Sequence, residues 1–136
     1  MTPKEQFDLF KSECKKWIEV FKEYDCDVYF TRGVKDEDKI GFCNYTNDRD
    51  DRQYTLQLAH SNILKYEDGT PYQKDMIKRI AFHEVMEMIL SRLQLLGEDR
   101  FITETDIRDE MHRLIMKFEN VIFEMGADFF LNKNKR

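Results

Sequence analysis

Residues 79–90 read RIAFHEVMEMIL, and this apolar run with ionisable side chains embedded in it decides how the chain folds. A helix with so little polar surface must be covered by other parts of the protein on most of its sides. With its flanking residues, the run predicts a long helix over residues 71–96. A turn and helix-entry signal at residues 67–71 precedes this helix, and Gly97 is placed to end it.

Two ionisable side chains in this run, His83 and Glu87, are four residues apart. On a helix they project from one face at neighbouring turns, so that both can approach one metal ion. Glu84 follows His83 with a rotation of about 100 degrees, which places it at the rim of the same site. There it would hold and deprotonate a metal-bound water as a general base. A buried carboxylate is costly unless it is paired, hydrogen-bonded or bound to a metal.

The next helical segment supplies a third ligand. Residues 103–125 carry apolar residues at helical spacing, with Thr103 as a candidate N-cap and Gly126 as the end of the helix. If the two helices pair antiparallel about a turn near residue 98, His83 lies about 15 residues before the turn and His112 about 14 after it. This symmetry predicts that His112 meets His83 and Glu87.

The N-terminal part predicts one helix followed by three strands. Apolar residues recur at three- and four-residue steps over residues 3–23, with Thr2 as the N-cap. Residues 28–31, 39–45 and 53–59 then favour strands, and Gly41 in the second of them indicates a bulge or close packing. Because each link is short, we expect an antiparallel meander. In the third strand, the even-numbered face should be buried, and its residues are Tyr54, Leu56 and Leu58.

These elements predict a single α+β domain over residues 1–131. It would consist of an N-terminal helix, a three-stranded antiparallel sheet and two long antiparallel helices. The last five residues, 132–136 (NKNKR), are predicted to form a disordered basic tail.

The motif helix resembles the active-site helix of the zincin metallopeptidases, which carries His-Glu-x-x-His. His83 and Glu84 match the first ligand and the general base, whereas Glu87 stands at the position of the second histidine ligand. The segment around His112 also resembles a helix of small phage-encoded proteins that have a zincin-like motif. The resemblance implies a minimal zincin core, a bound Zn2+ ion and hydrolysis of a peptide or protein substrate by a metalloprotease-like phage protein.

Other interpretations of the same residues remain open. The chain could be a non-catalytic phage protein that keeps a zincin-like scaffold and binds a host protein partner. Alternatively, Glu84 and Glu87 could form a structural ion network with Arg79 or Arg92, without any metal. One further histidine, His60, could act as a fourth ligand or a substrate contact, and Asn62 and Tyr66 are weaker polar candidates.

The composition narrows the classes of partner and location. The formal net charge of −5 argues against nucleic acid as the default partner. No apolar run approaches the roughly 20 residues that a membrane span requires, and the start lacks the apolar core of a secretory signal. Three widely spaced cysteines do not form a disulfide framework, so we expect a protein of the reducing cytoplasm.

Overall fold

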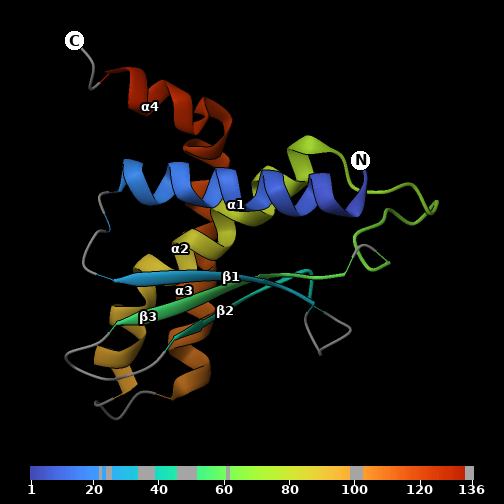
Figure 1. The fold of residues 1–136 in the computed structure, drawn as a ribbon. Coiled ribbons are helices and arrows are strands. Elements are labelled where there is room, and N and C mark those ends of the chain that lie inside the picture. Colours follow the sequence, from blue (N-terminus) through green and yellow to red (C-terminus); the bar gives the residue numbers. More distant parts are fainter. Residues whose placement is uncertain are drawn as a thin grey trace.

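The computed structural model has the expected α+β order of one helix, three strands and further helices (Figure 1). It describes residues 1–21, 23, 26–33, 39–45, 52–60, 62–98 and 103–133. The elements are α1 (Pro3–Val20), β1 (Asp27–Arg32), β2 (Gly41–Tyr45), β3 (Gln53–Leu58), α2 (Lys74–Glu98), α3 (Glu104–Val121), the 3-10 helix η1 (Phe123–Met125) and α4 (Ala127–Lys133).

Helix α1 begins with the predicted cap at Thr2. The Thr2 hydroxyl accepts a hydrogen bond from the Glu5 backbone N–H at 3.1 Å, and the Glu5 carboxylate accepts one from the Thr2 N–H at 2.7 Å. This reciprocal pair satisfies two donors that the first helical turn leaves free. The helix ends at Val20, earlier than predicted, and buries Phe10 and Trp17 in the core.

The sheet corrects the prediction of an antiparallel meander. Its strand order is β1-β3-β2, so β3 lies in the middle, parallel to β1 and antiparallel to β2. Strands that follow one another in the sequence need not be neighbours in the sheet, so the link between β1 and β2 does not by itself enforce a hairpin. The central strand, β3, is the one whose inward-facing residues are fully buried, whereas the inward-facing residues of the edge strand β1 are only partly buried.

The face of β3 that the alternation predicts is the buried one. Tyr54, Leu56 and Leu58 are buried, and the residues between them are at least partly accessible. Their core partners on the helices include Trp17, Ile77, Phe82 and Val85. The period of two in this strand is therefore confirmed.

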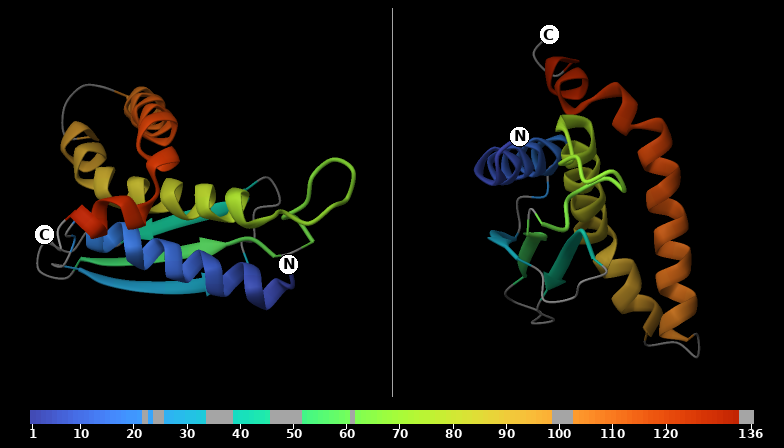
Figure 2. Two further views of the ribbon diagram at one scale, coloured as in Figure 1. Left: turned by 90° about the horizontal axis from the view of Figure 1, so that it is seen from above. Right: turned by 90° about the vertical axis from the view of Figure 1, so that its right-hand side faces the viewer.

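Helix α2 lies between the sheet and α3 (Figure 2). It begins at Lys74, three positions after the predicted start, because Pro71 instead forms an isolated β-bridge with Lys65. Gly97, predicted to end the helix, is in its last turn. Within the described part of the chain, no helix combines the length and the apolar character needed to cross a bilayer.

The C-terminal region differs from the single long helix predicted for residues 103–125. Thr103 caps α3 as expected, and its hydroxyl accepts a hydrogen bond from the Asp106 N–H at 3.2 Å. However, α3 ends at Val121, and η1 and α4 follow it. Helix α4 packs on α1, where Asp128 lies 3.5 Å from Lys16. It also includes residues 132 and 133, which had been assigned to a disordered tail, and residues 134–136 lie outside the described residues.

Candidate metal centre

Three side chains with metal-ligating atoms meet between α2 and α3. His83 and Glu87 come from neighbouring turns of α2, and His112 comes from α3. One ligand atom from each residue lies within 4.8 Å of the other two. The Nε2 atom of His112 is 2.9 Å from Glu87 Oε1, and the Nε2 atom of His83 is 3.8 Å from the same oxygen. The sequence had named these three residues as the ligand set.

The two histidines meet because α2 and α3 run antiparallel. Contacts pair Glu87 with His112 and His83 with Glu119, so that higher numbers on one helix face lower numbers on the other. The rings of His83 and His112 are stacked at 5.7 Å between centroids, with an angle of 25° between their planes. The mirrored placement about the turn therefore brings the two rings together, as predicted.

The spacing and chemistry of this grouping fit a divalent metal. Around a tetrahedral zinc ion with bonds of about 2.0–2.1 Å, ligand atoms lie roughly 3.3 Å apart. The ligand atoms here lie within 4.8 Å of one another, so binding of zinc would draw them closer together. Two imidazoles and one carboxylate form a ligand set that catalytic zinc sites use, with the fourth position left for water or substrate. These residues can therefore hold a metal ion.

A buried carboxylate on α3 orients His83. The Nδ1 atom of His83 donates a hydrogen bond to Glu119 Oε1 at 2.8 Å, which leaves Nε2 directed toward Glu87 and His112. Glu119 Oε2 in turn lies 4.0 Å from the Arg79 guanidinium. Burial lowers the pKa of His83, but the hydrogen bond to Glu119 and the charges of Glu87 and Glu119 raise it more, so that the net shift is upward.

Glu84 lies on the sheet-facing side of the centre, deeper than the rim position expected from the sequence. It is buried against Gly41 of β2, where a Cβ atom would lie 2.6 Å from Glu84 Oε1. The predicted close packing at Gly41 is thus confirmed. Glu84 Oε2 is buried without a hydrogen-bonding partner in the described part of the structure. Burial raises the pKa of Glu84 well above its usual range, and the charge and hydrogen bond of Glu87 raise it further.

The centre opens into a cavity of about 730 Å³ between β2, α2 and α3. This volume is within the range of small-molecule and peptide sites, about 300–1,000 Å³. The three ligands and Glu84 line it together with apolar side chains, which are Ile40, Phe42, Met76, Ile80 and Met111. Cys43 also lines it, and burial followed by the charges of Glu84 and Glu87 raises the pKa of its thiol. The thiol is therefore protonated at neutral pH.

The remaining polar candidates do not join this centre. His60 packs over Gly33, where a Cβ atom would lie 2.5 Å from the imidazole, and it does not line the cavity. Asn62 is exposed, and the Tyr66 ring packs edge-on against Tyr72.

Among the described side chains, no ion pair joins Arg79 to Glu84 or Glu87. The carboxylate that Arg79 contacts is Glu119, at 4.0 Å. The side chain of Arg92 is outside the described part of the chain. Glu119 is the residue of this centre that the sequence analysis did not single out, because its contact with His83 depends on the rotation of α3 about its axis.

Comparison with protein-family models, curated proteins and solved structures gives no match to this chain. The zincin resemblance therefore rests on the sequence motif alone.

Proposed function

We propose that this protein binds one divalent metal ion, zinc in the first place, through His83, Glu87 and His112, and that it is a metal-dependent hydrolase. The observation that carries the proposal is the convergence of these three side chains within 4.8 Å at the wall of a cavity. This grouping differs from a solvated patch of acidic side chains. It joins two histidines and a glutamate from two helices, and the neighbouring Glu119 orients one of the imidazoles.

Glu84 is the residue proposed to move the proton. When bound, zinc would supply a Lewis acid and lower the pKa of a water molecule in its open position. Glu84 lines the same cavity and hydrogen-bonds with Glu87, so it lies beside the metal ligands without belonging to the group of three. Burial and Glu87 raise the pKa of Glu84 in the metal-free protein, whereas a cation bound beside it would favour its ionised form. The ionised carboxylate could then accept the proton of the attacking water and return it to the leaving group.

A peptide or protein amide is the substrate class that the proposal favours. The support is the zincin-like order of His83 and Glu84 on a helix, together with an edge strand, β2, that lines the cavity. Glu87 replaces the second histidine of the zincin motif. Because carboxylate oxygen is a harder ligand than imidazole nitrogen, the metal preference of this site is expected to differ from that of a site with the His-Glu-x-x-His motif.

Elemental analysis of the full chain, purified without a histidine tag, tests the metal part of this proposal. We expect about one zinc ion per chain after dialysis against zinc and washing, and none in the variant His83→Ala. His60→Ala is the matched control, since this histidine lies away from the centre, and it should retain the zinc. Equal metal content in all three proteins would contradict the site.

A screen with blocked peptides tests the hydrolytic part. The zinc-loaded protein should cleave some peptides, and a chelator should abolish the cleavage. If the protein binds zinc stoichiometrically but cleaves nothing in a broad screen, the hydrolase proposal is wrong and the metal has another role.

A further inference from the structure

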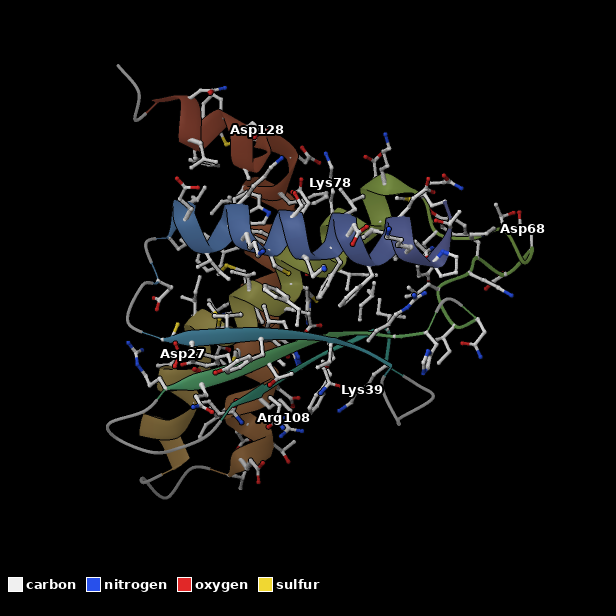
Figure 3. The ribbon with its side chains drawn as sticks, in the orientation of Figure 1. Asp27, Lys39, Asp68, Lys78, Arg108 and Asp128 are labelled. Carbon is white, nitrogen blue, oxygen red and sulfur yellow. The ribbon has the colours of Figure 1, made fainter. Side chains whose placement is uncertain are left out.

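Three cationic side chains surround the candidate metal centre from three different segments. Lys39 precedes β2, Arg79 is on α2 and Arg108 is on α3, and all three line the same cavity (Figure 3 labels Lys39 and Arg108). The cavity wall also carries three carboxylates, on Glu84, Glu87 and Glu119. The cavity is thus lined by equal numbers of basic side chains and carboxylates, and burial and Glu87 raise the pKa of one of these carboxylates, Glu84, well above its usual range. The formal net charge of the whole chain is −5.

A bound divalent ion would leave this cavity with an excess of positive charge. A cleft with one sign of charge and low-dielectric walls concentrates ligands of the opposite sign. The apolar wall residues, such as Ile40, Phe42 and Met111, provide such surroundings. The ligand best suited to this cavity thus combines an apolar portion with an anionic group.

Among the three cations, Arg108 is best placed to receive that group. Lys39 Nζ lies over the Phe42 ring, 4.7 Å from its centroid, and an ammonium group lacks the planar fork with which a guanidinium binds a carboxylate. Arg79 contacts the buried Glu119 and stacks on the Phe123 ring at 5.5 Å, so its guanidinium is already engaged within the fold. Among the described residues, Arg108 pairs with Glu104 alone, at 3.2 Å across one turn of α3, and both side chains are more than half exposed. Such an exposed ion pair contributes little to the stability of the fold, so Arg108 can readily exchange Glu104 for the carboxylate of a ligand.

The spacing along α3 relates Arg108 to the metal ligands. Arg108 is four residues before His112, so the two side chains project from one face about one turn, or ~5.4 Å, apart. An anion bound by Arg108 would therefore lie toward the start of α3 from the metal ligands, on the order of one helical turn along the axis. A planar guanidinium binds a carboxylate through two parallel hydrogen bonds.

We propose that the substrate of this site carries a carboxylate about one helical turn from the bond that reacts at the metal, and that Arg108 binds this carboxylate. The inference rests on the proposed function, since it names the substrate class of the same site. The carboxylate can belong to an acidic side chain or to the C-terminus of a peptide, and both present the same chemistry to Arg108.

Equilibrium binding to the full chain carrying Glu84→Gln separates this inference from turnover. The probes are fluorescent peptide pools of neutral residues that contain one Glu or, in the matched pool, one Gln at a fixed position, with both ends blocked. A third pool has no acidic residue but a free C-terminal carboxylate. Binding is measured by anisotropy, with and without zinc, and the zinc content of each sample is determined.

We expect at least one carboxylate pool to bind roughly 10-fold more tightly than the neutral pool, as for a hydrogen bond to a charged group. Tighter binding of the Glu pool would identify the recognised carboxylate as that of an acidic side chain, and tighter binding of the third pool would identify it as the C-terminus. Arg108→Gln should remove the preference. Arg113→Gln should retain it, because Arg113 is an exposed arginine of the same helix, pairs with Glu110 and does not line the cavity.

Equal binding of all pools, or a preference that survives Arg108→Gln, would overturn the inference. Absence of zinc in the samples would count against the proposed function instead. A carboxylate preference that persists in zinc-free protein would still support the role of Arg108, because its guanidinium remains charged without the metal. The two proposals can therefore fail separately.

Discussion

Glu119 Oε1 on α3 accepts a hydrogen bond from His83 Nδ1 on α2, and the two atoms are 2.8 Å apart. Glu119 is buried and His83 is half-buried. This contact fixes the tautomer of His83 so that Nε2 is free to bind a metal. Histidine ligands in metal sites commonly donate their second N–H to a carboxylate, which orients the ring and increases its basicity. The contact joins the two helices at the centre, and Glu119 would thus support the site without touching the metal.

Replacing Glu119 by Ala should weaken zinc binding by roughly 10–100-fold, because the imidazole loses its orienting partner. Glu119→Gln keeps a hydrogen-bond acceptor, so its zinc affinity should fall less. Competition with a chromogenic chelator measures the zinc Kd of each variant. Glu124→Ala removes an exposed glutamate just beyond α3 and provides the control. An unchanged Kd in Glu119→Ala would show that the contact does not support metal binding.

The variants Glu84→Gln and His83→Ala should have different effects on zinc content. The glutamine keeps the size and shape of Glu84 but cannot accept a proton, so zinc content should stay near that of the wild type while turnover falls by roughly 10²-fold or more. The alanine removes a ligand, and both zinc and activity should be lost. Metal analysis and peptide cleavage on the same samples distinguish the two. If Glu84→Gln loses as much zinc as His83→Ala, Glu84 is a ligand and its proposed role is wrong.

Gly41→Ala should destabilise the fold by about 1–3 kcal/mol, as overpacking of a filled site does. The new Cβ atom would lie 2.6 Å from Glu84 Oε1 and 3.1 Å from Ile80 Cγ2. Urea unfolding measures the loss. In the background of Glu84→Ala the first clash is absent, so the same glycine substitution should cost less, and a double-mutant cycle gives the difference. Strictly additive costs would indicate that β2 and α2 are not in the contact described.

The pH dependence of stability should change sign with zinc. In metal-free protein, the folded pKa of His83 lies above its ordinary value of 6.5. Its ion pair with Glu119 thus contributes fully below that value and is lost as the pH rises through the folded pKa. Zinc binds only the deprotonated imidazole, so stabilisation by zinc should instead grow with pH.

Urea midpoints from about pH 5.5 to about 8.5, with and without zinc, would check this reversal, because histidine titrates in that range. In metal-free protein, Glu119→Gln should reduce the pH dependence of stability that comes from His83, since it removes the charge that favours protonated His83. A metal-free profile that is the same in wild type and Glu119→Gln would contradict the assignment of the shift to this pair.

Local patterns in the sequence determined several features of this protein. Side-chain periodicity predicted α1, α3 and the buried face of β3, because the spacing of apolar residues follows directly from the geometry of helix and strand. The caps at Thr2 and Thr103 were readable for the same reason, since the hydroxyl and the N–H that it binds are only three residues apart. The grouping of His83 and Glu87 on one helical face also follows from their spacing alone.

The tertiary structure decided what depends on contacts between distant segments. The order β1-β3-β2 could not be read from the strands, since no local pattern states which edge of β3 each neighbour takes. Helix α4 escaped prediction because its seven residues are too short for a periodic signal, and it is stabilised by packing on α1. The choice of His83 as the partner of Glu119, and the depth of Glu84 against Gly41, depend on how α2 is rotated and packed against α3 and β2. The sequence could place the ligands on their helices, whereas only the packing of those helices determined which side chains surround the centre.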